Sequence, residues 1–511
     1  MTDPIVGIDL GTSNTVIARA DGVTGQVKVL ADANGFKIHP SVVSFHPTGG
    51  VVVGAAAKQR KVIDPRNTIF SVKRLIGRRF SSPEVQTAKQ RVPYQIKEGT
   101  DQLPMIVTRG GELAVPEMSA ILLDHARNVA TTALGTEVRR AVVTVPASFN
   151  DAQRSATATA GSIAGLEIVR VLDEPTAAAL AYGNTRKLDE TIAVYDFGGG
   201  TFDITILRLA DQVYEVLGTA GDTFLGGDDL DERLVERLVD TFLEENRVDL
   251  RTNEVSMMRL RAVAEQTKIE LSRRSRALVR VDEIAYGPNG KPLDLQIEIR
   301  RDELVRQIAD IVDKTFLACE EALRYANLDI TQISDVILVG GTTKIPYVRD
   351  QVARFFGKPP RTDLNPEDVV AVGAALQASA FERAPAVAVG PERTTSGHSQ
   401  GKRAQDLRAT ERPVTRGEHH DRFELAPPPP TAPGEPVIGR LTKNVGPAKT
   451  RGMPSQTTTP AAKRLPAVSV IVDPSASDDA LPTSEDIDFP DDGTEKGFFE
   501  EPLSPGSTAK G

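Results

Sequence analysis

Two short segments far apart in the chain share a pattern that suits phosphate binding. The first is GIDLGTSNT, around Gly11 and Thr12, and the second is VYDFGGGTFD, around Gly198 to Thr201. In each, an apolar strand ends in a carboxylate and is followed by a turn of small residues and a second strand. Glycines and hydroxyls at such a hairpin tip let backbone N–H groups approach phosphate oxygens closely, because no Cβ stands in the way. The similarity of the two segments predicts two related lobes, each contributing one hairpin tip to a phosphate-binding site.

Three carboxylates accompany the two tips: Asp9, Asp196 and Asp203. They would repel a bare polyphosphate, so they indicate a metal cation between protein and ligand. Mg²⁺ suits this role, because it is usually held by one or two hard oxygen ligands and several waters. Either tip alone is an ordinary hairpin, and only the pair favours a metal–phosphate site.

A third turn, ILVGGTTKIP, contains Gly340, Gly341 and Thr342, and Pro346 suits the start of the helix that follows. A strand–Gly-Gly–helix junction can hold the nucleoside end of a ligand by close backbone approach, although the same junction also serves packing. No G-x-x-x-x-G-K-[ST] occurs, which excludes a P-loop. No G-x-G-x-x-G opens a helix after a strand, which argues against a Rossmann dinucleotide site.

The elements that position these turns follow from the alternation of short apolar runs with amphipathic segments, which predicts an α/β fold. Two helices are predicted over 230–242 and 304–325, with Asp228 and Asp229 as N-cap residues of the first. Cys319, on the second, is expected to be a small buried hydrophobe. Strands are predicted at residues 5–10, 42–45, 141–145, 191–195, 204–209 and 336–339.

Composition limits the class of protein. The 511 residues carry a formal net charge of −9, the reverse of a nucleic-acid-binding footprint. The single cysteine excludes an internal disulfide and fits a reducing compartment. No leader pattern and no apolar run long enough to span a bilayer is present, so we expect a soluble, cytoplasmic protein that binds neither nucleic acid nor membrane.

The composition changes near Pro385. Of the 34 prolines, 18 fall in residues 385–511, where apolar residues are scattered. The first part of this segment is net basic and the part from Val468 onward is acidic, so we expect a disordered tail that acts as a spacer or binds unknown protein partners. The apolar positions from Phe381 onward are too sparse to predict alternating β-strands.

With the three turns in place, residues 4–380 resemble the nucleotide-binding domain of the heat-shock-protein-70 (DnaK-type) chaperones. The resemblance implies an actin-like, ribonuclease-H-like two-lobed ATPase domain, with lobe I at 1–183, lobe II at 184–383 and a disordered tail at 384–511. It is carried by nine ordered blocks: IVGIDLGTSNT, NTIFSVKRLIGRRF, VVTVPASFNDAQRSAT, GLEIVRVLDEPTAAALAYG, IAVYDFGGGTFDITIL, GDTFLGGDDLDERL, EQTKIELS, VILVGGTTKIP and NPEDVVAVGAALQA.

The resemblance also implies roles for the tips and their carboxylates, with ATP or ADP as the ligand. Asp9, Asp196 and Asp203 would organise Mg²⁺, its waters and potassium ions. The residues that would hold phosphates are Gly11 and Thr12 from lobe I and Gly198, Gly199, Gly200 and Thr201 from lobe II.

The catalytic residues implied by the resemblance are Lys73, Glu174, Thr201 and Asp203. Lys73 would place its ammonium by the γ-phosphate, and Glu174 would orient or deprotonate the attacking water. Without the resemblance, a lysine in the basic run KRLIGRR is an ordinary solvated charge. Similarly, Glu174 before a proline is an ordinary helix-start carboxylate.

Glu265, Lys268 and Ser272 lie at i, i+3 and i+7, on one predicted helix face. The resemblance implies that this face meets ribose and adenine, with Gly340, Gly341 and Thr342 completing the nucleoside site. The alternative for Glu265 and Lys268 is a plain i, i+3 ion pair.

Further matches concern communication with partners. Pro146 and Arg154 match a relay between nucleotide and interdomain surface, while Asn150, Asp151 and Arg170 match positions for domain coupling and J-domain cochaperones. A nucleotide-exchange factor is a second expected partner. Two positions depart from the family pattern: Ser148 replaces the usual tyrosine of the coupling loop, and Lys344 replaces an arginine near adenine, which weakens planar stacking.

The predicted function is that of an ATP-binding, slowly ATP-hydrolysing chaperone-family switch acting in protein folding through partners. Beyond Ala380 the family's leucine-rich linker and β-sandwich are not recognisable, so the chain alone is expected to hold peptides poorly. Two alternatives remain: a bacterial-actin-like filament, which sedimentation with ATP would reveal, and an actin-fold small-molecule kinase, for which no sugar-binding base is found.

Overall fold

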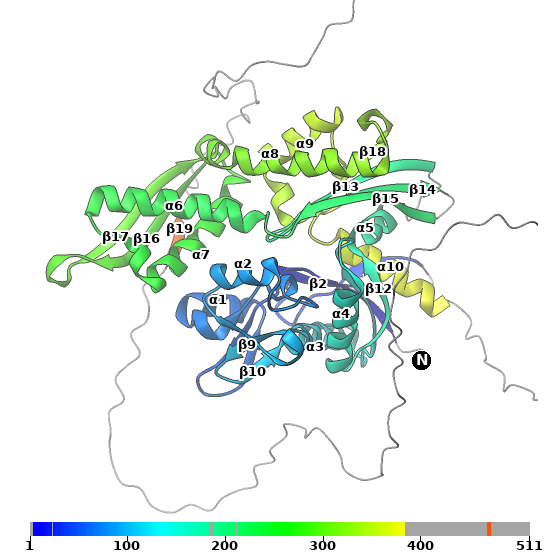
Figure 1. Cartoon of the computed structure of the whole chain (residues 1–511), viewed down its shortest axis with the longest axis horizontal. Helices are drawn as coiled ribbons and strands as arrows, with labels where there is room; N and C mark the ends of the chain where they lie inside the picture. The colour runs from blue at the N-terminus through cyan, green and yellow to red at the C-terminus, as the bar shows by residue number, and fades with distance from the viewer. Residues whose placement is uncertain (1–3, 23, 184–188, 211–212, 384–467, 472–511) are drawn as a thin grey trace, which may run out of the picture. The chain divides into compact units, whose positions relative to one another are not determined.

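Two mixed sheets dominate the described part of the chain, which comprises residues 4–22, 24–183, 189–210, 213–383 and 468–471 in the computed structural model (Figure 1). The first sheet has the strand order β12-β11-β1-β2-β3, with β4 also paired to β2. Its strands are β1 (Ile5–Leu10), β2 (Asn14–Ala20), β3 (Val27–Val29), β4 (Ile38–Pro40), β11 (Arg140–Val145) and β12 (Glu167–Asp173).

The second large sheet has the order β15-β14-β13-β18. Its strands are β13 (Asp189–Phe197), β14 (Phe202–Ala210), β15 (Val213–Asp222) and β18 (Asp335–Val339). In both sheets an antiparallel hairpin is followed across the sheet by a parallel strand: β1 pairs with β2 and β11, and β13 pairs with β14 and β18. This repeated arrangement confirms the predicted pair of hairpins and the actin-like α/β class.

Three smaller sheets complete the strands of the described residues. One joins β5 (Val43–Phe45), β6 (Val51–Val53) and β7 (Thr68–Ile69), and another joins β8 (Gln95–Glu98), β9 (Pro104–Thr108) and β10 (Gly111–Ala114). The third has the order β17-β16-β19, with β16 (Arg276–Tyr286), β17 (Pro292–Arg300) and β19 (Val468–Ile471).

Helices cover these sheets. Among them, α8 packs against β14 and β15, and α10 packs against β1, β2 and α5, so the last helix of the fold returns to the first sheet. The helices are α1 (Ala55–Ile63), α2 (Pro83–Arg91), α3 (Val115–Leu134), α4 (Asp151–Ile163), α5 (Glu174–Gly183), α6 (Gly227–Asn246), α7 (Glu254–Leu271), α8 (Arg301–Ala326), α9 (Pro346–Phe356) and α10 (Val369–Arg383). The 3₁₀ turns are η1 (Pro65–Asn67), η2 (Val72–Arg74), η3 (Thr100–Gln102), η4 (Leu250–Thr252), η5 (Pro288–Gly290), η6 (Ile330–Gln332) and η7 (Gly341–Lys344).

Two large apolar cores lie under these layers. One is built from β1, β11 and α3, and the other from β13, β14, α6, α7 and α8. A smaller cluster on α5 and α10 lies against residues of both sheets, including Val142 and Val194. The helical spacing in α6 is confirmed, since its five apolar positions are all buried: Leu230, Leu234, Val235, Leu238 and Phe242.

The predicted N-cap of α6 is wrong by two residues. The helix begins at Gly227 after Gly226, so Asp228 and Asp229 lie in its first turn. Asp229 still serves the helix end, because its Oδ2 accepts a hydrogen bond from the backbone N–H of Gly226 at 2.9 Å. Gly226 takes the cap position because a Cβ there would lie 2.5 Å from the Gly199 carbonyl oxygen.

The predicted tail at 384–511 lies outside the described residues, with the exception of Val468–Ile471. At these four residues the expectation that no strand forms beyond Phe381 is wrong, because they pair with β16. The run VSVIV, rich in β-branched residues, was the available signal. Cys319 is buried and free, as expected, and no helix among the described residues has the length and apolarity needed to cross a bilayer.

Candidate nucleotide-binding cleft

The tips of the two large hairpins face each other. A Cβ on Gly199 would lie 2.3 Å from the Ser13 hydroxyl oxygen, and one on Gly200 would lie 3.0 Å from a methyl carbon of Thr12. Gly11 is equally confined, since its Cβ would lie 2.3 Å from the Asn14 carbonyl oxygen. Glycine at 199 and 200 therefore lets the two turns approach each other, whereas Gly11 is needed within its own turn.

The second tip is held by hydrogen bonds from three directions. The Gly198 N–H donates to the Thr201 carbonyl at 3.0 Å, which closes the turn. The Gly198 carbonyl in turn accepts from the Gly227 N–H at 3.0 Å and from the Thr342 hydroxyl at 2.8 Å. The start of α6 and the third glycine turn are thus fixed to the same tip.

The third turn also needs glycine where it approaches the second hairpin. Gly340 has φ +86°, and a Cβ there would lie 2.3 Å from the Phe197 carbonyl oxygen. Gly341 is less confined, because a Cβ there would have a Glu367 carboxylate oxygen as its nearest neighbour, at 3.5 Å. Lys344, the residue that replaces the family's arginine, forms an ion pair with Glu367.

Lys73 and Glu174 form an ion pair between these turns. Lys73 lies in η2, which follows Ser71 in a left-handed conformation, and Glu174 is the first residue of α5. Their side chains are only 9% and 11% exposed, so Lys73 is not a solvated surface charge. Burial would lower the pKa of Lys73, but the charges of Glu174 and Asp9 outweigh it and hold this pKa above its ordinary value.

The three predicted metal-site carboxylates are buried in the same region. Asp9 accepts a hydrogen bond from the Thr144 hydroxyl at 2.9 Å, and the Ser148 hydroxyl lies 3.3 Å from Asp203. Burial, followed by the charge of Glu174, raises the pKa of Asp9 to about 6 and that of Asp203 to about 7. The pKa of Asp196 is raised well above its ordinary value for the same two reasons.

This donor set fits a hydrated magnesium ion. Within the described residues, no three Asp, Glu, His or Cys side chains form a ready-made ligand cluster. Burial and then the charge of Glu174 disfavour the ionised forms of these carboxylates, and a nearby cation would stabilise those forms. Mg²⁺ needs only one or two protein oxygens beside its waters.

A single cleft collects most of the predicted residues. Asp203, Gly200 and Thr342 adjoin it through the contacts above but do not line it. The predicted residues that line the cleft are Asp9, Gly11, Thr12, Lys73, Glu174, Asp196, Gly198, Gly199, Thr201, Gly340 and Gly341.

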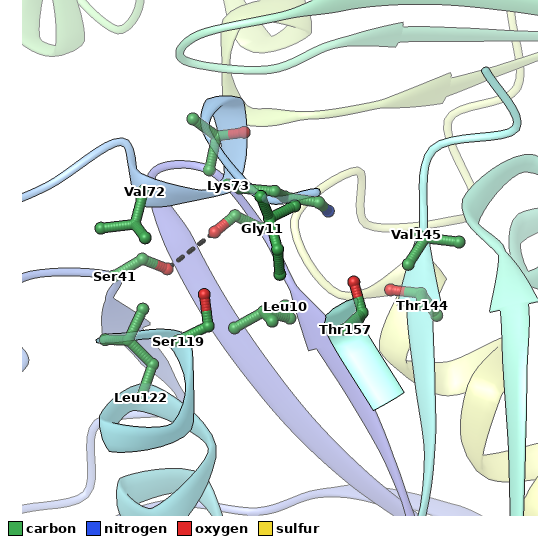
Figure 2. Close-up of a pocket in the computed structure, with 12 residues that line it drawn as sticks. Leu10, Gly11, Ser41, Val72, Lys73, Ser119, Leu122, Thr144, Val145 and Thr157 are labelled. Carbon is green, nitrogen blue, oxygen red and sulfur yellow. Dashed lines mark hydrogen bonds between the residues drawn. The ribbon is translucent and has the colours of Figure 1, made fainter. Parts of the chain in front are cut away.

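A small enclosed hollow lies beneath Gly11 and Lys73 (Figure 2). Its polar side chains are Lys73 and the hydroxyl residues Thr12, Ser41, Ser119, Thr144 and Thr157. The Ser41 hydroxyl donates to the Gly11 carbonyl at 2.8 Å and so supports the first tip from below. The Ser41 hydroxyl thus helps to set the conformation of this tip.

The predicted nucleoside residues are only partly brought together. Glu265 lines a neighbouring hollow and pairs with Lys58 at 2.6 Å, whereas Lys268 pairs with Asp231 at 2.9 Å. Glu265 and Lys268 therefore form ion pairs with other residues, and the alternative of an i, i+3 ion pair between them is wrong. Lys268 and Ser272 line neither the cleft nor this neighbouring hollow. Ser272 follows the last residue of α7 as its C-cap.

Several residues of the neighbouring hollow, beside the cleft, were not singled out from the sequence. Arg74 is 7% exposed, donates to the Gly200 carbonyl and lies 3.6 Å from Asp228. Lys58 and Asp231 are the partners of Glu265 and Lys268. Arg74 adjoins Lys73 in SVKRL and Asp231 lies in GGDDLDERL, so their position within the blocks was an available signal, whereas Lys58 lies outside every block.

The residues expected to communicate with partners occupy one end of the first sheet. Arg154, on α4, pairs with Asp173 at 2.6 Å, directly before Glu174. Asn150 caps α4 by accepting from the Gln153 N–H at 3.0 Å. Arg170 is exposed on β12, and Pro146 is buried after β11. This ion pair thus connects α4 to Asp173, the residue before the predicted catalytic residue Glu174.

A comparison with known families supports the interpretation of this cleft. A family model described as Hsp70 protein matches residues 5–388, which include every residue of the cleft. Members of that family are ATPases of the chaperone class, bind ATP or ADP with Mg²⁺, and generally work with J-domain proteins and nucleotide-exchange factors. Because the match spans most of the chain and the fold and the facing glycine turns agree with it, the chain belongs to the Hsp70 family.

Proposed function

We propose that this chain binds MgATP in the cleft between the two hairpin tips, hydrolyses it slowly, and acts as a nucleotide switch that partners recognise. The observation that carries the proposal is the buried Lys73–Glu174 ion pair between two glycine tips that approach each other. A positively charged group and a carboxylate, both withdrawn from water, are suited to stabilise charge that develops during phosphoryl transfer.

The glycine turns would bind the phosphates through backbone N–H groups. Gly11 and Thr12 lie on one side of the cleft and Gly198, Gly199 and Thr201 on the other. Because the second turn is closed by the Gly198–Thr201 hydrogen bond and the first is held by hydrogen bonds from Ser41, little ordering is needed when the phosphates bind. Gly340 and Gly341 line the same cleft and would contact the nucleoside.

The two charged side chains would then act on the terminal phosphate. Lys73 is held by Glu174 and would stabilise the charge of the transferred group, while Glu174 would orient the attacking water. Asp9, Asp196 and Asp203 would hold Mg²⁺ through its waters, and the ion supplies charge neutralisation of the phosphates. The same carboxylates would also bind K⁺.

The Arg154–Asp173 ion pair supports a role for the outer surface in partner recognition. Asp173 directly precedes Glu174, so a partner that disturbs this pair would also affect the position of Glu174. A J-domain protein and a nucleotide-exchange factor are the proposed partners, in keeping with the family. Arg170 and Asp151 are exposed beside this pair.

The test is isothermal titration of ATP in the presence of Mg²⁺ with the full chain and two glycine variants. Gly199→Ala should abolish detectable binding, because its Cβ would meet the Ser13 side chain and separate the tips. Gly22→Ala is the matched control, since its Cβ has no neighbour closer than the Glu382 carboxylate at 3.6 Å. Absence of ATP binding by the unmodified chain, or equal binding by both variants, would refute the proposal.

A further inference from the structure

The segment Val468–Ile471 forms the third strand of the β17-β16-β19 sheet, although residues 384–467 separate it from the end of α10. It pairs antiparallel with β16, with Val468 opposite Val281 and Ile471 opposite Leu278. It also packs against α7 (Figure 1). A short piece of the C-terminal region thus completes a sheet of the folded domain.

Without β19, this sheet would be a two-stranded hairpin in which the second edge of β16 is open. β16 pairs with β17 on one side only, from Arg276 to Tyr286. Open strand edges present unpaired N–H and C=O groups, and two-stranded sheets are marginal unless another element completes them. The edge of β16 is therefore available to a further strand.

Side chains of α7 already donate hydrogen bonds to backbone carbonyls of β16 that directly follow the residues paired with β19. Arg259 donates to the carbonyls of Asp282 and Glu283 at 2.6 and 2.8 Å, and the Ser256 hydroxyl donates to the Ile284 carbonyl at 2.6 Å. The pairing with β17 is irregular over the same residues, and Glu283 has φ +47° there. The stretch that remains for another strand is Leu278–Val281, where β19 pairs.

The register also suits the residue types. Val470 and Val468 lie opposite the buried Val279 and Val281, while Ser469 lies opposite the exposed Arg280. A shift of one residue would place the serine opposite a buried valine, and such a shift exchanges the two faces of a strand. The segment lies between Pro466 and Pro474, which have no backbone N–H to donate to a ladder.

The intervening length permits this pairing within one chain. Residues 384–467 span on the order of 250 Å when fully extended, far more than the roughly 40–50 Å expected for the diameter of a domain of this size. A tether also raises the effective concentration of the segment at the edge, so a short strand suffices for binding.

We propose that the exposed edge of β16 at Leu278–Val281 is a strand-docking site whose occupant is the segment Val468–Ile471 of the same chain. The domain thereby holds its own C-terminal region on the sheet beside α7, and an extended segment from another molecule would have to displace it. This inference rests on backbone pairing and does not depend on the proposed nucleotide chemistry.

The test is hydrogen exchange, followed by mass spectrometry, on peptides covering β16 in the full chain. The variant carries Ser469→Pro and Val470→Pro together, because successive N–H groups point in opposite directions along a strand and one of the two must face β16. Exchange of the Leu278–Val281 amides not bonded to β17 should increase at least about tenfold. The matched control carries Ala476→Pro and Ser477→Pro, outside the paired residues, and should exchange like the unmodified chain.

Two further arms identify the occupant. A synthetic peptide of residues 465–475, added at millimolar concentration to the double-proline variant, should restore the slow exchange, which also shows that the variant is folded. In the unmodified chain the protection should not change over a hundredfold dilution, because pairing within one chain is independent of concentration. Unchanged exchange in the double-proline variant, or protection lost on dilution through pairing between copies, would overturn the proposal.

Discussion

At the scale of residues, the Lys73–Glu174 ion pair is the feature that most clearly separates this cleft from an ordinary junction of hairpins. Both side chains are nearly inaccessible to water, and Asp9 and Asp196 lie close enough to raise the pKa of Lys73. Burying a lysine among carboxylates costs stability unless the charges are compensated. Such a cluster is typical of a site that is completed by a charged ligand.

We predict that Lys73→Ala lowers kcat for ATP hydrolysis on the order of 10²-fold, because it removes a preorganised charge that acts mainly in the transition state. ATP affinity should change much less. Single-turnover kinetics with the full chain provides the measurement. Glu174→Gln should also slow turnover, by less if water replaces an orienting group. An unchanged single-turnover rate for Lys73→Ala would contradict the assigned role.

A second prediction concerns Asp203, whose pKa burial raises from 3.8 to about 7 in the folded protein. The folded state therefore binds this proton more tightly than the unfolded state, and ionisation destabilises the fold. The stability that Asp203 contributes is present below pH 3.8 and is lost as the pH rises to about 7. Asp203→Asn should accordingly gain stability relative to the unmodified chain between pH 4.5 and 8, by at most about 4 kcal/mol.

Urea unfolding of the nucleotide-free protein in EDTA measures this difference. Glu215→Gln is a suitable control, because Glu215 is an exposed carboxylate on β15. The control should show no comparable trend relative to the unmodified chain. A constant difference between the Asp203→Asn variant and the unmodified chain across this range would show that Asp203 keeps an ordinary pKa.

At the scale of elements, the junction between β18 and η7 brings two adjacent glycines with different constraints to the cleft. Gly340 combines φ +86° with a position where a Cβ would meet the Phe197 carbonyl oxygen at 2.3 Å. Gly341 has neither constraint. The first glycine is therefore required by the fold, whereas the second is free to serve a ligand.

We predict that Gly340→Ala destabilises the protein by more than about 1 kcal/mol, because alanine is strained in this backbone region and its Cβ has no room. Gly341→Ala should leave the free energy of unfolding nearly unchanged but weaken ATP binding, since its methyl group would enter the cleft. Urea unfolding and ATP titration of both variants give the two readouts. Normal ATP affinity in Gly341→Ala would remove this turn from the nucleoside site.

At the scale of the whole molecule, four apolar cores stabilise the domain. Among the residues whose burial the structure describes, those that form these cores lie between Ile5 and Ala378. Within the described residues, β19 adds one edge strand to a sheet whose other two strands already belong to the domain. Folding and catalysis are therefore expected to survive without the C-terminal region.

We predict that a chain of residues 1–385 hydrolyses ATP within about twofold of the full chain, because the described residues that line the cleft end at Val370. Limited proteolysis of the full chain should leave a resistant core that ends near residues 380–385. Steady-state ATPase assays and mass spectrometry of the core provide the measurements. A protected C-terminal fragment of domain size would reveal a second folded domain.

The sequence alone predicted what depends on local pattern. Apolar strands ending in Asp9 and Asp196, and the glycines after them, identify the two hairpins because turn geometry is decided by adjacent residues. The buried face of α6 follows from helical spacing in the same way. The roles of Lys73 and Glu174 came from resemblance to the family rather than from pattern, since each residue by itself has an ordinary surface or capping explanation.

Only the tertiary structure decided which distant residues meet. Lys58 pairs with Glu265, Arg74 reaches the Gly200 carbonyl, and Val470 pairs with Val279, although each pair is separated by more than a hundred positions in the chain. No periodicity connects such residues, because their contact depends on how helices and sheets pack after they form. The strand at Val468–Ile471 is the clearest case: its sequence suits a strand, but only the open edge of β16 decides that one forms there.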